Sequence, residues 1–313
     1  MSDAPTCGGI DLGGTKIEAT LFDATLTPIK TRRVATPQTE YADLLDALSG
    51  EIAWLRAEAR QSDLPVGVGI PGLIDPVTGC SHTANLPAKG KPLGTDLMAR
   101  NGGTIRLAND CKCFALSEAT RGAGDGYRTV FGLILGTGLG GGVVVDGALL
   151  PGPNMLAGEV GHAALPAPLV AQHQLPLLPC GCGRKGCFET YLSGAGMTRL
   201  CQVLTGQSRT APDLVAAAAS GETAAGQVFA VWLQIAGELL HNLQLHLDPD
   251  CIVLGGGLSK IDGLDHAFSE ALAQAALPAL RAPVISKPEF GDSSGTRGAA
   301  LLVRSAPDQG MTQ

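Results

Sequence analysis

Two similar units, each made of a strand, a glycine-rich turn and a second strand, restrict the folds open to this chain. Residues 7–22 (CGGIDLGGTKIEATLF) form the first unit, and residues 129–150 (TVFGLILGTGLGGGVVVDGALL) form the second. Apolar Ile17, Ala19 and Leu21 alternate with polar residues after the first turn, a pattern typical of a strand. We interpret the pair as an internal structural duplication in which each half of the chain opens with a hairpin.

The rest of the chain alternates between segments of strand and of helix character. Strands are expected at 66–72, 104–110 and 250–259. The first is short and buried and ends in a Pro-Gly turn, the second leads into a helix, and the third runs into glycines. Helices are expected at 38–60, 111–120, 228–247 and 292–303. This alternation places the chain in the α/β class.

Composition and charge narrow the classes of function. The chain has 313 residues, enough for two domains, and a formal net charge of −7 with no run of Lys and Arg. We therefore expect neither nucleic acid nor an anionic membrane as a partner. The apolar segment 228–247 is interrupted by polar residues, and no signal peptide is visible, so a cytoplasmic protein is expected. Nine cysteines in a reducing compartment favour metal binding or core packing over disulfides.

Three glycine-rich loops follow apolar strands, at 11–16 (DLGGTK), 136–142 (GTGLGGG) and 255–259 (GGGLS). Such loops bind phosphates through converging backbone N–H groups, although each one alone could be a tight hairpin turn. The second loop contains G-x-G-x-x-G, but three valines at 143–145 predict a strand where a dinucleotide site needs a helix. GGTK in the first loop is not a Walker loop either, because the pattern G-x-x-x-x-G-K-[ST] does not occur there. The interpretation that remains is a nucleotide held between two hairpin loops that face each other.

Asn109 and Asp110 stand where the strand at 104–110 gives way to a helix. Either residue could be a helix N-cap, whose side chain accepts hydrogen bonds from free backbone N–H groups. Alternatively, Asp110 could be a general base that takes the proton from a hydroxyl that accepts a phosphoryl group.

Cys180, Cys182 and Cys187 form a C-x-C-x₄-C cluster that favours zinc over a redox centre, for which C-x-x-C is typical. Zinc needs a fourth ligand. His162 in GEVGH is the best candidate, and His173 remains an alternative. Four protein ligands would make the zinc structural. Such a site would also bring Glu159 and Glu189 together as acceptors for a polyol, unless both are simply solvated surface acids.

These residues together resemble the ROK family of sugar kinases over nearly the whole chain. DLGGTK at 11–16 is similar to the family's first phosphate motif, LGTGLGGG at 135–142 to its second and GGGLS at 255–259 to its adenosine-side loop. GEVGH at 158–162 with CGCGRKGCFE at 180–189 resembles its zinc signature. The resemblance implies an actin-like, hexokinase-like α/β fold of two domains that close on ATP, Mg²⁺ and a sugar.

The resemblance also implies roles for individual residues. Asp110 would deprotonate the 6-hydroxyl of the sugar. The sugar hydroxyls would be held by Asn85, Asn109, Asp110, Glu159, His162 and Glu189, and the structural zinc by His162, Cys180, Cys182 and Cys187. ATP would contact the three glycine loops at Asp11, Gly13, Gly14, Thr15, Lys16, Gly136, Thr137, Gly138, Gly140, Gly141, Gly255, Gly256 and Gly257. The smaller domain would comprise 1–115 with about 290–313, and the larger 116–289. A homodimer is implied as well.

Within the family, ANLPAKGKPLGTDL at 84–97 is closest to bacterial N-acetylglucosamine kinases, and GDSSGTRGAA at 291–300 is closer to fructokinases. N-acetylglucosamine is therefore the expected substrate, with fructose, glucose and N-acetylmannosamine as alternatives. A non-catalytic sugar sensor related to the family's repressors is a further alternative, although no helix-turn-helix is expected before Asp11. Cys111 and Lys112 depart from the usual N-D-A-N, and the lysine could either lower the pKa of Asp110 or point to solvent.

Overall fold

The computed structural model describes residues 4–83 and 86–304, and the chain divides into two compact units. Unit 1 contains the described residues up to Thr120, Gly147–Ala157 and those from Asp292 onward. Unit 2 contains Arg121–Asp146 and Gly158–Gly291. The division differs from the expected boundaries, because α3 (Asp110–Ala119) stays whole within unit 1 and residues 147–157 return to that unit.

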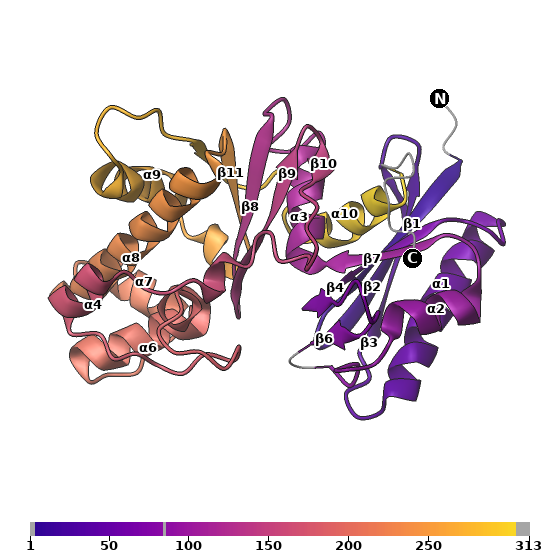
Figure 1. Ribbon diagram of the computed structural model, residues 1–313, viewed down its shortest axis with the longest axis horizontal. Helices are drawn as coiled ribbons and strands as arrows, with labels where there is room; N and C mark the ends of the chain where they lie inside the picture. Colours follow the sequence, from indigo (N-terminus) through magenta and orange to yellow (C-terminus); the bar gives the residue numbers. More distant parts are fainter. Residues whose placement is uncertain (1–3, 84–85, 305–313) are drawn as a thin grey trace. The chain divides into compact units, whose positions relative to one another are not determined.

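Unit 1 is built on a five-stranded sheet in the order β3-β2-β1-β4-β7 (Figure 1). Its strands are β1 (Pro5–Leu12), β2 (Lys16–Asp23), β3 (Pro28–Ala35), β4 (Val66–Ile70) and β7 (Ile105–Asn109). Neighbours among β1, β2 and β3 are antiparallel, whereas β4 is parallel to both β1 and β7. The first predicted hairpin and the strands predicted at 66–72 and 104–110 are confirmed.

Helices cover both faces of this sheet. The helices α1 (Tyr41–Ala59) and α2 (Leu93–Asn101) lie on one face, where Leu44, Leu48 and Leu55 join the core of the sheet. The helices α3 and α10 (Ser294–Leu302) pack on the other face. Unit 1 is completed by the short strands β5 (Leu73–Ile74), β6 (Ser81–His82) and β10 (Ala148–Leu149). A 3₁₀ turn at Gly291–Ser293 precedes α10.

Burial on both faces changes the environment of β2. Its polar residues Glu18 and Thr20 are as buried as the apolar residues with which they alternate. Glu18 tolerates this position because Arg33 Nε donates to its carboxylate at 2.6 Å and Lys16 Nζ lies 3.5 Å away. The strand is therefore an interior strand and not a half-exposed one.

Unit 2 repeats the arrangement of unit 1. Its strands β9 (Leu139–Val145), β8 (Thr129–Leu135), β11 (Cys251–Gly255) and β12 (Val284–Ser286) follow one another in that order. The pair β8 and β9 is an antiparallel hairpin, whereas β11 is parallel to both β8 and β12. Each unit thus has a glycine-turned hairpin followed by two parallel strands, which is what the predicted duplication requires. Because β9 begins at Leu139, inside the second loop, and its glycines continue into a strand and not a helix, the exclusion of a dinucleotide fingerprint is confirmed.

The helices of unit 2 pack around a long apolar one. They are α4 (Ala167–His173), α5 (Glu189–Leu192), α6 (Gly194–Thr205), α7 (Ala211–Ala219), α8 (Thr223–Leu247) and α9 (Leu264–Ala275), with 3₁₀ turns at Val160–His162 and Gly257–Lys260. Trp232 of α8 is fully buried and stacks on Phe229, 5.7 Å between ring centroids. Among the described helices none alone is long and apolar enough to cross a membrane, although α7 and α8, bent by 115°, pass that test as a pair.

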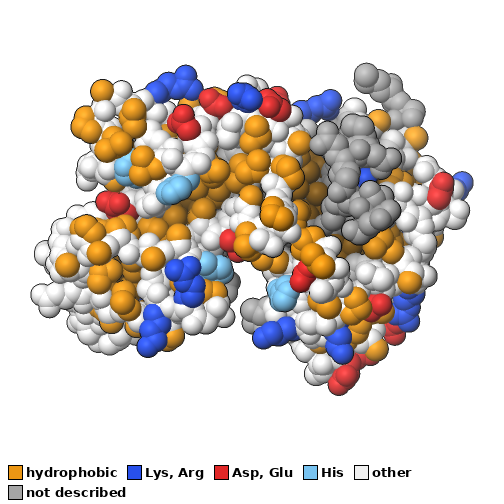
Figure 2. All heavy atoms as spheres, in the orientation of Figure 1, with side chains coloured by type: hydrophobic (Ala, Val, Ile, Leu, Met, Phe, Trp, Pro, Cys, Tyr) orange, Lys and Arg blue, Asp and Glu red, His pale blue; other side chains and the backbone are white. Residues whose placement is uncertain are grey.

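Charged side chains are spread over the surface. On the face shown in Figure 2, Lys and Arg occur singly or in small separate groups.

Two glycines allow α10 to lie directly on the backbone of the sheet in unit 1. A Cβ atom on Gly67 would lie 1.7 Å from the carbonyl oxygen of Ala299, and one on Gly9 would lie 1.9 Å from that of Thr296. Gly8, the neighbour of Gly9, faces Leu55 of α1 instead. Only glycine therefore permits this close helix-on-sheet packing.

We expect Gly67→Ala to lower the free energy of unfolding by about 3 kcal/mol, because the added methyl group must push α10 away from β4. Urea unfolding followed by circular dichroism measures the change. Gly50→Ala is the matched control, since Gly50 is exposed on α1 with open space around its Cα. That variant should be more stable than the parent by about 1 kcal/mol. Equal effects of the two substitutions would contradict the proposed packing.

Candidate functional site

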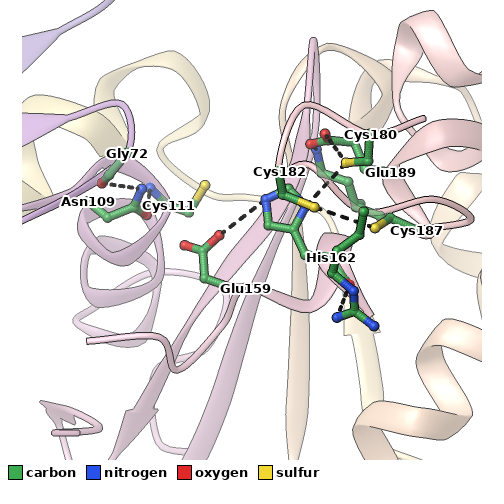
Figure 3. A network of polar contacts seen from close by, with 11 residues as sticks. Gly72, Asn109, Cys111, Glu159, His162, Cys180, Cys182, Cys187 and Glu189 are labelled. Carbon is green, nitrogen blue, oxygen red and sulfur yellow. Dashed lines mark hydrogen bonds and ion pairs between the residues drawn. The ribbon is translucent and has the colours of Figure 1, made fainter. Parts of the chain in front are cut away.

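Asn109 is the N-cap of α3, which leaves the carboxylate of Asp110 for another task. The Asn109 Oδ1 accepts from the backbone N–H of Cys111 at 2.9 Å and of Lys112 at 3.3 Å, and Nδ2 donates to the Gly72 carbonyl at 3.0 Å (Figure 3). The amide has one further hydrogen with which it can donate. Asp110 is the first residue of the helix and is half-buried, and its Oδ1 accepts from Cys111 N–H at 2.8 Å.

Asp110 and Asp11 both stand at carboxyl ends of strands in the sheet of unit 1. Burial raises the pKa of Asp110, although hydrogen bonds from Cys111 oppose this. Burial, the negative charge of Asp110 and that of Glu18 raise the pKa of Asp11 to about 6, whereas Lys16 opposes the shift. The charge of Asp110 therefore acts on Asp11, and both carboxylates hold a proton more readily than an ordinary aspartate.

Lys112 does not point to solvent. Its side chain is buried, with 3% of the residue exposed, and Nζ donates to the carbonyl oxygen of Met155. The lysine thus fastens segment 147–157 to α3, and this bond helps to explain why the segment belongs to unit 1. Cys111, the other departure from the family motif, is half-buried beside Asp110.

The first glycine loop connects β1 to β2 and is open to solvent. Gly13 N–H donates to the Lys16 carbonyl at 2.9 Å and closes the turn. Gly14, Thr15 and Lys16 are exposed, and a Cβ atom on Gly14 would meet no heavy atom within 4 Å. This loop can therefore admit an anion.

The second and third glycine loops lie side by side in unit 2, because they follow the parallel strands β8 and β11. Gly256 has φ +79°, and a Cβ atom there would lie 2.5 Å from the carbonyl oxygen of Leu135. Within the second loop, Gly136 N–H donates to the Gly138 carbonyl at 3.0 Å, and Gly194 N–H donates to the Gly136 carbonyl at 2.8 Å. The beginning of α6 therefore supports this loop.

Glu189 joins the second glycine loop to the cysteine cluster. Its Oε2 accepts from Leu139 N–H at 3.0 Å, and its Oε1 accepts from the Cys180 thiol at 3.6 Å. A carboxylate has about four acceptor sites, so these two bonds leave capacity for a ligand hydroxyl.

The ligand atoms of His162, Cys180, Cys182 and Cys187 all lie within 4.8 Å of one another (Figure 3). The Sγ atoms of Cys182 and Cys187 are 3.7 Å apart, and Cys180 Sγ is 3.6 Å from His162 Nδ1. Tetrahedral zinc with Zn–S near 2.3 Å and Zn–N near 2.0 Å would separate such pairs by about 3.8 and about 3.5 Å. The donor set and its spacing therefore fit zinc.

Of the two histidines considered as the fourth metal ligand, His162 is the one that lies beside the cysteines. His173 lies elsewhere, with its Nε2 2.6 Å from Gln234 Oε1. Backbone pairing brings the two distant segments together, since Phe188 N–H donates to the Ala163 carbonyl at 3.0 Å. His162 directs its second nitrogen, Nε2, toward Glu159 Oε2 at 3.9 Å.

The remaining expected site residues divide between the units. Asp11, Gly13, Gly14, Thr15, Lys16, Asn109 and Asp110 belong to unit 1, and the members from Gly136 to Gly257, including Glu159, belong to unit 2. Asn85 lies outside the described residues.

The sequence predictions did not include a cavity in unit 2 beside the second glycine loop. A cavity of about 450 Å³ in unit 2 is lined by Thr137, Glu189, Ser193, Ala195 and Arg199, among others. Ser193 caps α6 by accepting from Gly196 N–H at 3.0 Å, and Arg199 Nε donates to the Thr190 carbonyl at 3.0 Å. The Ser-Gly pair at 193–194 is a helix-start signal that could have indicated this wall of the second loop.

Comparisons with known proteins agree on one family. The ROK family model matches residues 7–306. The chain is 40% identical over 295 residues to an N-acetylgalactosamine kinase of Shewanella sp. (strain ANA-3), covering 94% of this chain and 95% of the relative. It is 41% identical over 297 residues to the N-acetyl-D-glucosamine kinase of Vibrio cholerae, covering 94% and 98%.

Solved structures agree with this result. The crystal structure of a ROK hexokinase from Thermus thermophilus is 30% identical with a TM-score of 0.84, and the match covers 95% of this chain and 97% of that one. A ROK family glucokinase from Streptomyces griseus, solved with glucose and AMPPNP, is 28% identical with a TM-score of 0.76 over 96% and 99% of the two chains.

Asp11→Asn should stabilise the protein in a pH-dependent way. A folded-state pKa of about 6 against an ordinary 3.8 means that ionised Asp11 disfavours folding above pH 6. The amide should therefore raise the free energy of unfolding at pH 7.5 by roughly 2–3 kcal/mol. The gain should fade as the pH falls through 6 and should be lost only below about 3.8, where Asp11 is protonated in both states.

Urea unfolding at pH 7.5 and pH 4.5 measures this difference. Asp63→Asn serves as the control, because Asp63 is exposed and its substitution should change stability by less than about 0.5 kcal/mol at either pH. A gain for Asp11→Asn at pH 4.5 that equals or exceeds the gain at pH 7.5 would contradict the electrostatic argument.

Proposed function

The chain belongs to the ROK family, and from this membership we propose that it is an ATP-dependent sugar kinase that phosphorylates the 6-hydroxyl of N-acetyl-D-glucosamine. The observation that most supports the proposal is that two neighbouring residues at the start of α3 have different roles. Asn109 caps the helix, and the adjacent Asp110 keeps a carboxylate with a raised pKa that can accept a proton. The fold is the α/β fold of hexokinase-like ROK kinases.

The acetamido sugar is inferred from the relatives. Two relatives at about 40% identity over 94% of the chain are named kinases of N-acetyl-D-glucosamine and of N-acetylgalactosamine. These sugars differ only in the orientation of one ring hydroxyl, and each carries a 6-hydroxyl. N-acetylgalactosamine is therefore the second candidate substrate.

Catalysis in this scheme depends on a few side chains. Asp110 accepts the proton of the 6-hydroxyl while that oxygen attacks the γ-phosphorus of ATP, the bond from this phosphorus to the β–γ bridging oxygen breaks, and ADP leaves. The N–H groups of the glycine loops bind the phosphates. Asn109, through its second amide hydrogen, and Glu159, His162 and Glu189 hold the sugar hydroxyls, with Asn85 as a further expected contact.

Asp11 is the residue that would hold Mg²⁺ together with the phosphates of ATP. Its carboxylate is a hard oxygen ligand, and burial together with the charges of Asp110 and Glu18 raises its pKa more than Lys16 lowers it, so a bound cation would stabilise the ionised form. Bound Mg²⁺ would neutralise negative charge on the phosphate oxygens.

His162, Cys180, Cys182 and Cys187 would hold a structural zinc ion. With Nδ1 directed at the metal, Nε2 of His162 carries the proton and can donate to Glu159 or to a sugar hydroxyl. Four protein ligands complete the coordination shell, so the zinc would shape the sugar-binding wall and would not activate water. We also infer a homodimer in the cytoplasm, where ATP is available and the nine cysteines stay reduced.

The proposal is tested by ADP release in the presence of ATP and Mg²⁺ with a panel of sugars. The panel should contain N-acetylglucosamine, N-acetylgalactosamine, N-acetylmannosamine, fructose, glucose and mannose. We expect the highest kcat/KM with N-acetylglucosamine. Release with none of these sugars, together with measurable sugar binding, would instead identify a sugar sensor without catalysis.

Asp110→Asn should lower kcat at least about 100-fold, because the amide cannot accept the proton of the hydroxyl. The protein should remain folded, since Asn109 still caps α3. In the parent enzyme, the raised pKa of Asp110 should move the acid limb of the kcat/KM–pH profile, which reports the free enzyme, above the ordinary 3.8, so that activity falls earlier on acidification. Steady-state kinetics between pH 4.5 and 8 measures both effects. An unchanged kcat in the variant would remove Asp110 from this role.

Cys182→Ser should lose bound zinc and much of the protein's stability, because structural zinc can contribute on the order of 10 kcal/mol. Elemental analysis of the purified protein should give one zinc per chain in the parent and much less in the variant. Cys80→Ser is the control, since Cys80 is a half-buried cysteine of unit 1 outside the cluster. A parent protein without zinc would refute the metal site.

A further inference from the structure

The segment that follows β3 binds the carbonyl groups of the first glycine loop. Thr36 Oγ1 donates to the Gly13 carbonyl at 2.8 Å, and Thr36 N–H donates to the Thr15 carbonyl at 3.1 Å. Gln38 Nε2 donates to the Gly14 carbonyl and also to the Thr36 carbonyl, the latter at 3.1 Å. Three successive carbonyl groups of the loop are therefore held by two residues.

These bonds fix the direction of the loop's N–H groups. In a trans peptide the C=O of one residue and the N–H of the next point to opposite sides. With the carbonyls of Gly13 and Gly14 turned toward Thr36 and Gln38, the N–H groups of Gly14 and Thr15 point away from that segment. The space around Gly14 is open, so an anion can reach these groups.

Neither polar side chain is needed for packing alone. Thr36 is buried, with 5% of the residue exposed, and valine would fill the same volume without the hydroxyl. Gln38 is exposed, and both acceptors of its amide nitrogen are backbone carbonyls, which fixes the orientation of the amide. Both side chains thus act on the backbone of the glycine loop.

We propose that Thr36 and Gln38 are positioning residues that preorganise the first glycine loop for the phosphates of ATP. The inference rests on the proposed function, in which this loop binds ATP. Neither residue touches the nucleotide in this scheme. Loss of the Thr36 hydroxyl lets the Gly13–Gly14 peptide rotate. ATP must then order the loop as it binds, which weakens its affinity.

The test is the kinetics of Thr36→Val with ATP and N-acetylglucosamine varied separately. We expect KM for ATP to rise about tenfold, the change expected when one well-placed hydrogen bond is lost. KM for the sugar should stay within about twofold, and Thr36→Ser should restore the parental value. Gln38→Leu should raise KM for ATP in the same direction, and its exposed position keeps folding intact should Thr36→Val fail to fold.

Thr20→Val is the matched control. Thr20 is a buried threonine in the same sheet, and its hydroxyl lies 3.1 Å from the Thr31 hydroxyl, away from the loop. The Thr20→Val substitution should leave the KM for ATP and the KM for the sugar unchanged even if the melting temperature falls. In an active enzyme, the inference is overturned if Thr36→Val matches Thr20→Val, or if both KM values rise together. A parent protein without ATP-dependent turnover would overturn the proposed function and this inference together.

Discussion

Parallel pairing of β1 with β4 and of β4 with β7 is the constraint on which the site in unit 1 depends. Carboxyl ends of parallel strands lie at one edge of a sheet, so Asp11 and Asp110 come to the same edge although 99 positions separate them. The close contact of α10 with Gly9 and Gly67 then seals one face of the sheet. A Cβ atom on Gly295, in the first turn of α10, would lie 2.6 Å from Asp11 Oδ2. Packing thereby desolvates the carboxylates, and desolvation raises their pKa values.

The same pairing organises unit 2, with a different result. There, β8 and β11 bring two glycine loops together and place no carboxylate of their own between them. Glu189 enters from α5 and connects the second loop to the cysteine cluster through its two oxygens. A metal bound by Cys180 as a thiolate would remove the proton of this thiol, so Glu189 would then keep only its bond to the Leu139 N–H. One duplicated arrangement thus supplies two carboxylates and one glycine loop in unit 1, and two glycine loops beside a cysteine cluster that could hold a metal in unit 2.

Much of this arrangement could be predicted from the sequence, because its signals are local. Both hairpins, the strand that feeds α3 and the cysteine cluster are readable from spacing and residue type. The strand β3 was not predicted, since its charged residues lack apolar alternation. It is stabilised by distant partners instead, as when Arg32 pairs with Glu51 and covers the ring of Trp54. The burial of Lys112 was also unpredictable, because its partner, the Met155 carbonyl, is 43 positions away. Sequence alone likewise left open which of Asn109 and Asp110 caps α3, and only the geometry distinguishes them.

The central claim is that Asp110 serves the 6-hydroxyl of an acetamido sugar while ATP approaches from the glycine loops. A crystal structure with N-acetylglucosamine and a non-hydrolysable ATP analogue tests it most directly. The account predicts a carboxylate oxygen of Asp110 within about 2.6–3.2 Å of O6, with O6 directed at the γ-phosphorus. A well-ordered ternary complex in which Asp110 faces another hydroxyl, or solvent, would contradict it.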